Sequence, residues 1–277
     1  MKSILPLFRL NRSIMVAMIT GAAAFSAGAG INLSILMTIA GWCLAVGGFS
    51  LDLYADRDLD RDGVRAELRQ NPLTTGAISL KTGLVFSTTF IVISFLLMLV
   101  INPLGLIPWT IILLIIIGLA KHVFEAPLMR AFTLGALQAL YLIMGASIGR
   151  IHAGLWLLSG MFFFAMFGGR GMIDIRDYPL DKETRVSTLP KKFGIQNTAY
   201  FTLICLVIAF ALSLAAYFTG EFSRIYFYLD LIFITIGLSC AILFAIKPTP
   251  RLAWQLTLVF MVGSGSLMCL AMILGSL

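Results

Sequence analysis

The sequence has few charged residues and few of the residue types that build most metal and redox sites. Charged residues make up 12% of its 277 positions, and the chain holds only two histidines and four cysteines. The histidines fall on different predicted loops, which argues against a histidine-based metal site. The cysteines lie inside apolar segments without a CxxC spacing, so we expect them to be packing residues. They are Cys43, Cys205, Cys240 and Cys269.

A composition typical of soluble proteins is also missing. The chain is 60% hydrophobic and its mean hydropathy is +0.98, both outside the range of a soluble globular domain. Because roughly 20 helical residues cross a bilayer core about 30 Å thick, we expect an all-α polytopic membrane protein. It would form a single domain, residues 1–277, with nine transmembrane helices in a bundle around a central cavity. The predicted spans are residues 13–30, 33–51, 80–101, 104–120, 127–148, 154–170, 197–219, 224–246 and 252–276.

The basic residues predict the orientation of the chain. Lys2, Arg9 and Arg12 precede the first apolar run, as in a signal peptide, but no small-residue cleavage site ends that run, so we expect a retained first span. Of the 20 basic residues, all but Arg150 and Arg224 fall at the N-terminus or in loops after even-numbered spans. Cytoplasmic loops are enriched in Lys and Arg, which predicts a cytoplasmic N-terminus in an inner or plasma membrane. The net charge of +7 is then an orientation signal, and we expect no nucleic-acid partner.

The 13 acidic residues are concentrated in two places. Six lie within residues 52–67 and four within residues 174–183, and both regions follow predicted spans on the cytoplasmic side. Asp52, Asp56 and Asp60 are spaced i, i+4, i+8, which places their carboxylates on one face of a helix. Like charges at this spacing repel, so the cluster predicts a bound cation. Oxygen ligands together with substrate phosphates are typical of Mg²⁺.

The second acidic region predicts a similar face. Asp174, Asp177 and Asp181 are spaced i, i+3, i+7, although Pro179 is expected to interrupt the helix before Asp181. All six aspartates of the two regions are therefore candidate Mg²⁺ ligands. Interleaved basic residues can neutralise phosphate oxygens that the metal leaves uncovered, or can be solvated charges at the membrane surface. They are Arg57, Arg61, Lys182, Arg185, Lys191 and Lys192.

These motifs carry a resemblance to a known family. Residues 52–60, Asp-Leu-Tyr-Ala-Asp-Arg-Asp-Leu-Asp, resemble the N-D-x-x-D-x-x-x-D signature of the UbiA superfamily of intramembrane prenyltransferases. Residues 174–181 resemble its D-x-x-D-x-x-x-D region, the Thr-Leu-Pro at 188–190 resembles its T-L-P turn, and residues 71–76 are similar to its R-P-L-x-S-G turn. The resemblance covers essentially the whole chain. It departs from the family pattern by having Asp52 for Asn, Leu53 for Asp and Asn71 for Arg.

The resemblance implies a reaction. A prenyl group would pass from a polyprenyl diphosphate to a lipophilic or aromatic acceptor, as in quinone or lipid biosynthesis, with Mg²⁺ as cofactor and the active site facing the cytoplasm. The expected catalytic residues are Asp56, Asp60, Asp177 and Asp181. The expected diphosphate-binding residues are Arg12, Arg57, Lys121 and Arg185, of which Arg12 and Lys121 rest on the resemblance alone. Aromatic residues that could stabilise an allylic cation are Tyr141, Phe162, Phe163, Phe164, Phe167, Tyr200 and Tyr228.

Two other functions share part of these features. CDP-alcohol phosphotransferases also carry aspartates at the membrane surface, but the spacing of Asp58 and Asp62-Gly63 does not match their D-x-x-D-G element. A cation transporter would need carboxylates near the bilayer midplane. The predicted spans offer only Asp230, close to the outer end of its span.

Overall fold

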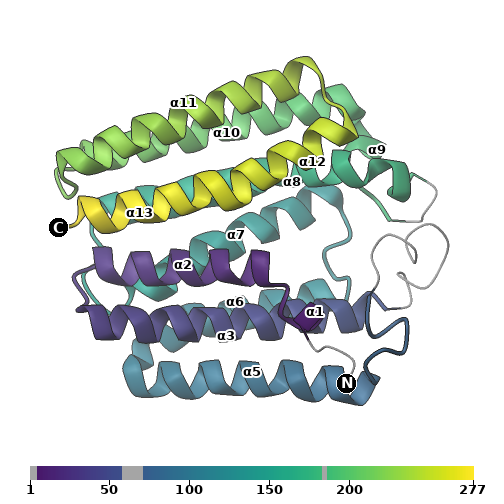
Figure 1. Ribbon diagram of the computed structural model, residues 1–277, viewed down its shortest axis with the longest axis horizontal. Helices are drawn as coiled ribbons and strands as arrows, with labels where there is room; N and C mark the ends of the chain where they lie inside the picture. Colours follow the sequence, from purple (N-terminus) through teal and green to yellow (C-terminus); the bar gives the residue numbers. More distant parts are fainter. Residues whose placement is uncertain (1–4, 58–70, 183–185) are drawn as a thin grey trace.

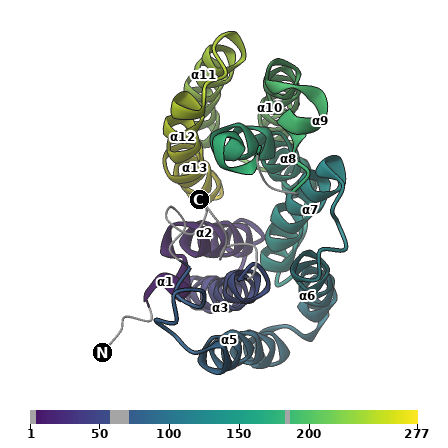
Figure 2. The same cartoon turned by 90° about the vertical axis from the view of Figure 1, so that its right-hand side faces the viewer.

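The protein is a bundle of long helices, described by a computed structural model over residues 5–57, 71–182 and 186–277. Every regular element in these ranges is a helix, which confirms the all-α prediction. The long helices run side by side along one direction (Figure 1). Seen end-on, they follow a ring with α5 at one extreme and α11 at the other (Figure 2).

Within the described ranges, seven helical segments are long and apolar enough to cross a membrane, so the chain is an integral, multi-pass membrane protein. Each matches a predicted span to within about four residues at both ends, except that α8 continues to Asp181, well beyond the predicted end at residue 170. They are α3 (Ile31–Ala55), α5 (Leu80–Ile101), a short 3₁₀ turn with α6 (Pro103–Ala120), α7 (Pro127–Ala146), α8 (Ala153–Asp181), α10 (Ile195–Tyr217) and α11 (Arg224–Ile246).

The first and last predicted spans fall on shorter or interrupted helices. The first overlaps α2 (Leu10–Ser26), which has 17 residues. The last is divided into α12 (Pro250–Leu258), a π-helical segment (Val259–Ser264) and α13 (Gly265–Gly275). Two short helices lie outside the predicted spans, α1 (Leu5–Phe8) and α9 (Leu189–Phe193). The number of nine crossings therefore stays a prediction.

Local sequence sets several helix ends. Ser79 caps α5 because its hydroxyl accepts the backbone N–H of Thr82 at 3.0 Å. The same helix ends at Ile101, where Pro103 cannot continue it. Asn102 stabilises the break, since its Oδ1 accepts the N–H of Leu104 at 3.2 Å. The predicted break between the third and fourth spans is confirmed.

Buried hydroxyls join the helices that build the first half of the bundle. Ser87 on α5 donates to the carbonyl of Gly47 on α3 at 2.7 Å, and Ser94 donates to the carbonyl of Ala40 at 2.8 Å. The indole N–H of Trp109 on α6 then donates to Ser94 at 2.9 Å. Within a bilayer, apolar side chains pack about as well against lipid as against another helix. Hydrogen bonds between helices therefore help to determine which helices pack together.

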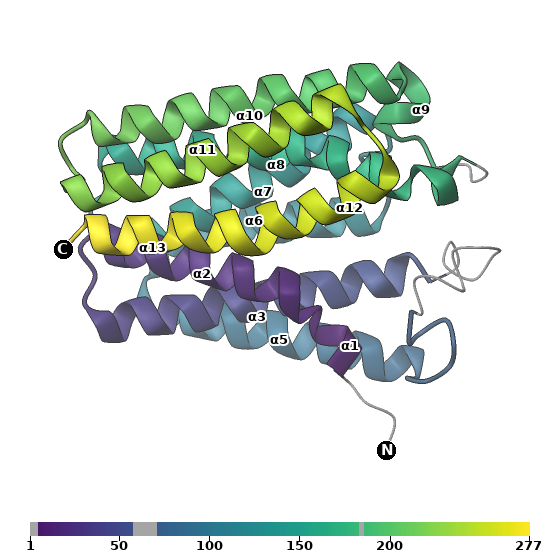
Figure 3. The same ribbon diagram turned by 45° about the horizontal axis from the view of Figure 1, so that its top comes forward.

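The interior contains two large hydrophobic cores. One packs α8, α10, α11, α12 and α13 together with parts of α2 and α7, and the other packs α3, α5 and α6 with other parts of α2 and α7. Helices α2 and α7 therefore belong to both. Helix α9 and the start of α2 lie toward one end of the bundle, while the C-terminal residue Leu277 lies at the opposite end (Figure 3).

Candidate active site

A cavity of about 1010 Å³ lies inside the bundle and begins where α3 and α8 end. Charged residues surround its entrance: Asp52 and Asp56 from α3, and Asp177 and Asp181 from α8. Apolar side chains from α2, α7, α8, α10, α11, α12 and α13 line the deeper part. Residues more than 100 positions apart in the sequence thus share one space, as the two acidic motifs predict.

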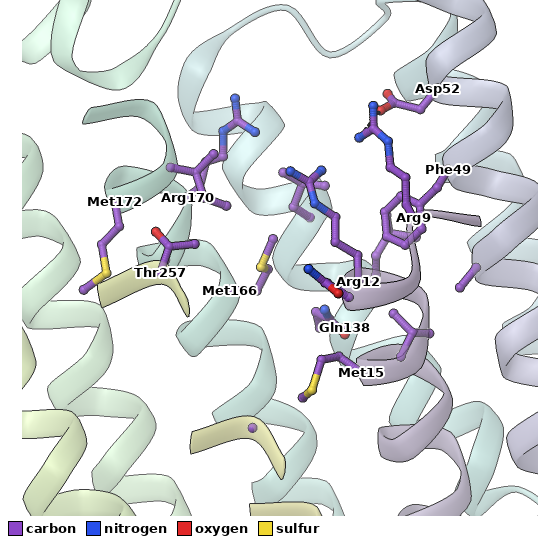
Figure 4. Close-up of a pocket in the computed structure, with 18 of the residues that line it drawn as sticks. Arg9, Arg12, Met15, Phe49, Asp52, Gln138, Met166, Arg170, Met172 and Thr257 are labelled. Carbon is purple, nitrogen blue, oxygen red and sulfur yellow. Dashed lines mark ion pairs between the residues drawn. The ribbon is translucent and has the colours of Figure 1, made fainter. Parts of the chain in front are cut away.

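The first acidic motif lies at the end of α3. Asp56 is almost completely buried at 6% exposure, and its Oδ1 lies 3.9 Å from Nε2 of His122 on the loop between α6 and α7. Asp52 lies one turn earlier, with its Oδ2 3.7 Å from Nη1 of Arg9 (Figure 4). Arg9 has a left-handed backbone with φ of 42°, an uncommon conformation for this residue type. The predicted ligand Asp60 lies outside the described residues.

The turn that begins at Asn71 folds back onto the end of α3. Asn71 is 2% exposed, donates from Nδ2 to the carbonyl of Leu53 at 2.9 Å, and accepts the N–H of Leu73 at 3.1 Å. Thr74 donates to the carbonyl of Arg57 at 3.1 Å. The departure from the family pattern at Asn71 therefore has a structural role, because the amide satisfies backbone groups next to the acidic motif.

The second acidic motif lies wholly on α8. The expected interruption at Pro179 is wrong, because α8 continues through it to Asp181. A proline so close to a helix C-terminus removes one hydrogen bond, and only two residues follow it. Asp177 and Asp181 line the cavity, and Asp177 accepts two hydrogen bonds from the Arg176 guanidinium, at 2.7 and 2.8 Å.

Asp174, the first acid of this motif, is held by protein partners. Its side chain is 3% exposed, and Oδ1 lies 2.7 Å from Nη2 of Arg170. Its Oδ2 accepts the backbone N–H of Leu189 at 3.0 Å, at the start of α9. Asp174 is not among the residues that line the cavity, whereas Arg170 is. The carboxylate therefore connects the Thr-Leu-Pro turn to an arginine that faces the cavity.

Among the residues that the structure describes, five arginines line the cavity. They are Arg9, Arg12, Arg130, Arg170 and Arg176. In Figure 4 the Arg12 side chain projects into the middle of the space, with Gln138 beside it.

Arg130, on α7, was not identified by the sequence patterns. Its guanidinium makes no hydrogen bond or ion pair with any residue that the structure describes, whereas its backbone is paired within α7. A partly buried guanidinium that faces a cavity without a partner is suited to bind an anion. Its position as the only charged residue within the predicted span 127–148 was the available signal.

The predicted diphosphate-binding residues are not all brought together. Arg12 lines the cavity, but Arg57 and Lys121 do not. The Arg57 guanidinium donates to the carbonyl of Tyr54 at 3.0 Å and lies 4.7 Å from the centre of the Tyr54 ring. Lys121 is exposed at the end of α6, and Arg185 lies outside the described residues.

A UbiA prenyltransferase family model matches residues 14–264. The chain belongs to the UbiA prenyltransferase family. Digeranylgeranylglyceryl phosphate synthase of Methanococcus vannielii is 26% identical to it over 246 residues, which cover 84% of this chain and 83% of the relative. Family membership makes the chain a prenyltransferase and decides against the CDP-alcohol phosphotransferase and transporter alternatives.

Solved structures confirm a UbiA-like fold. A structure of digeranylgeranylglyceryl phosphate synthase is 24% identical with a TM-score of 0.77, and the match covers 98% of this chain and 96% of that one. A UbiA homologue from Aeropyrum pernix K1 is 19% identical with a TM-score of 0.75, covering 91% and 96%. A UbiA homologue from Archaeoglobus fulgidus bound to GPP and Mg²⁺ is 18% identical with a TM-score of 0.72, covering 97% and 98%.

Proposed function

We propose that this UbiA prenyltransferase uses Mg²⁺ to transfer a prenyl group from a polyprenyl diphosphate to a lipid acceptor. The observation that carries the proposal is the shared cavity. Four carboxylates from the ends of α3 and α8 and five arginines surround its entrance, and an apolar space lies behind them. This combination suits an amphiphile with a highly charged head and a long hydrocarbon tail.

The acidic residues fit Mg²⁺ by their chemistry. Asp52, Asp56, Asp177 and Asp181 offer hard oxygen donors from two helices to one space. Within the described residues no three potential ligands lie close enough together to hold a metal by themselves, so phosphate oxygens of the substrate would complete the coordination. Bound there, Mg²⁺ would stabilise the negative charge that develops on the leaving diphosphate.

The arginines would bind the phosphate oxygens that the metal does not cover. Arg130 needs a counter-charge, and Arg12 and Arg170 approach the same space from α2 and α8. Fixed guanidinium groups in a cavity that excludes water stabilise charge without reorganising during the reaction. Their distribution over three helices would orient the diphosphate at the entrance, with the prenyl tail directed inward.

The M. vannielii relative is a digeranylgeranylglyceryl phosphate synthase, and this name favours a lipid acceptor that carries a glyceryl phosphate. A hydroxyl oxygen of the acceptor would form a bond to the allylic carbon of the prenyl donor as the bond from that carbon to the diphosphate oxygen breaks. The bonding electrons leave with the diphosphate, and the hydroxyl loses its proton. An aromatic acceptor would use the same donor site, so the acceptor assay described below distinguishes the two.

We further propose nine crossings with the N-terminus and the active site on the cytoplasmic side. The acidic motifs, α9 and the start of α2 lie at one end of the bundle, and Leu277 lies at the other, which supports an odd number of crossings (Figure 3). The distribution of Lys and Arg supports the orientation.

The test uses purified protein with labelled geranylgeranyl diphosphate, Mg²⁺ and either a mono-geranylgeranyl glyceryl phosphate or 4-hydroxybenzoate. We expect labelled product with the lipid acceptor, and loss of turnover in Asp56→Asn and Asp177→Asn. Thermal melts of both variants check that they fold. Product with the aromatic acid alone would exclude the lipid assignment, and unchanged turnover in both variants would exclude the site.

A further inference from the structure

The apolar part of the cavity extends into the larger hydrophobic core. The residues that line it there include Met161 and Phe162 on α8, Phe210 on α10 and Phe233 on α11. Each is at most 8% exposed. These core side chains form the walls of this part of the cavity, here called the arm.

The arm ends deep in the bundle. Phe210 lies 15 residues after Ile195, the first residue of α10, and Phe233 lies 13 residues before Ile246, the last residue of α11. Both of these helix ends lie at the charged end of the bundle (Figure 1). With a rise of about 1.5 Å per residue, the two rings lie roughly 20 Å along their helices from that end. Neither α10 nor α11 contributes a deeper residue to the cavity lining.

The two rings pack directly against each other. Their centroids are 5.4 Å apart and their planes are inclined at 78°, an edge-to-face arrangement that is favourable for aromatic pairs. Rings packed in this way resist displacement away from the cavity, because the core side chains behind them leave little free volume for them to enter.

Gly237 sets the position of the Phe210 ring. A Cβ atom added to Gly237 would collide with Cζ of Phe210 and would lie 2.7 Å from its Cε1. The ring therefore occupies space next to α11 that is free only because residue 237 has no side chain.

We propose that Phe210 and Phe233 form the end wall of the arm and determine the longest prenyl chain that the enzyme accepts. The inference rests on the proposed function, because it requires the arm to hold the prenyl tail. A tail that fills the arm meets the two rings end-on, and each further isoprene unit must displace one of them. Gly237 tunes the limit, since it decides how far the Phe210 ring withdraws from the arm.

The experiment compares geranyl, farnesyl, geranylgeranyl and geranylfarnesyl diphosphates as competing ligands of the purified protein in Mg²⁺. Phe210→Ala and Phe233→Leu are expected to improve binding of the longest ligand that the parent disfavours by about tenfold, as for a hydrophobic pocket that gains or loses small groups. Binding of geranyl diphosphate is expected to stay unchanged. Gly237→Ala is expected to act in the opposite direction and shorten the preferred chain.

Two further variants distinguish a specific effect of the Phe210 ring on chain-length preference from non-specific destabilisation of the protein. The double variant Phe210→Ala with Gly237→Ala is expected to follow Phe210→Ala, because the ring that the added methyl would push is gone. Phe218→Ala, which removes a ring that is 73% exposed just after α10, is expected to keep the parental preference.

The outcomes are distinguishable. If the parent binds geranyl diphosphate and the folded variants keep its chain-length preference, the end wall is elsewhere and the inference fails while the proposed function stands. If Phe210→Ala unfolds, Gly237→Ala and Phe233→Leu must still shift the preference in opposite directions. A parent that binds none of the four ligands would remove the proposed function and this inference together.

Discussion

Arg170 and Asp174 form a buried ion pair one turn apart on α8, with 2.7 Å between Nη2 and Oδ1. The second carboxylate oxygen of Asp174 accepts the N–H of Leu189. One side chain thus positions a cavity-facing cation and the start of α9 at the same time. Asp174 thus differs from Asp177 and Asp181 on the same helix: it is bound by protein partners outside the cavity lining, whereas the other two line the cavity.

Asp174 is therefore expected to act as a positioning residue, although its spacing predicts a metal ligand. Asp174→Asn retains an oxygen for Leu189 and should keep Mn²⁺ affinity, measured by titration with prenyl diphosphate present, within about threefold of the parent. Asp174→Ala leaves Arg170 buried without its partner and should cost about 3–5 kcal/mol of stability. Asp177→Asn is the comparison and should lose metal affinity. Equal loss of Mn²⁺ affinity in the folded Asp174→Asn protein would make Asp174 a ligand.

Arg130 is expected to contribute to substrate binding without stabilising the fold. Its guanidinium has no hydrogen-bond or ion-pair partner in the described part of the chain, so Arg130→Gln should leave the melting temperature unchanged or raise it. A hydrogen bond to a charged group contributes about 1.5–3 kcal/mol, so prenyl diphosphate should bind at least about tenfold more weakly. Arg150→Gln, with a side chain 83% exposed at the other end of the bundle, is the matched control. Parental affinity in the Arg130 variant would contradict the assignment.

Asn71 is expected to be important for the stability of the turn at the first acidic motif. Asn71→Ala removes hydrogen bonds to the backbone of Leu53 and Leu73, and leaving such buried groups unpaired costs about 1–3 kcal/mol each. The melting temperature should fall, and limited proteolysis should cut this region sooner. Thr75→Ala, at an exposed position of the same turn, should change stability by less than about 1 kcal/mol. The interpretation fails if the two variants are equally stable.

Asp230 is expected to be dispensable for prenyl transfer. It is fully buried in α11, away from the cavity lining, and neither carboxylate oxygen has a hydrogen-bond partner in the described part of the chain. A buried acid without a partner destabilises an apolar interior, so Asp230→Asn should keep parental turnover and an equal or higher melting temperature. A loss of turnover greater than about threefold in folded protein would give Asp230 a role that the cavity geometry does not provide.

The sequence was most informative where hydrophobicity alone decides the structure. Long apolar runs place the seven membrane helices, and Asn102-Pro103 predicts the break that ends α5. The acidic motifs at residues 52–60 and 174–181 predict a shared site because few other charges compete with them. Asp52, Asp56, Asp177 and Asp181 do line one cavity.

Features that depend on tertiary contacts were not predictable. Pro179 reads as a helix breaker, but α8 tolerates it near its end. The π-helical segment at Val259–Ser264 divides the last span, and it contains no proline from which the break could be predicted. Arg130 is the only charged residue in its predicted span, but no local pattern reports that its side chain faces a cavity shared with the acidic motifs. Arg57 illustrates the reverse case, since an arginine within a motif turns away toward Tyr54.

The two hydrophobic cores have a mechanical consequence. Asp52 and Asp56 end a helix of one core, and Asp177 and Asp181 end a helix of the other. A ligand bound by both acidic pairs would connect the two hydrophobic cores at the charged end of the bundle. Elsewhere the two cores are connected through α2 and α7, which belong to both. Substrate occupancy is then expected to stiffen the whole bundle, and departure of the diphosphate to loosen it.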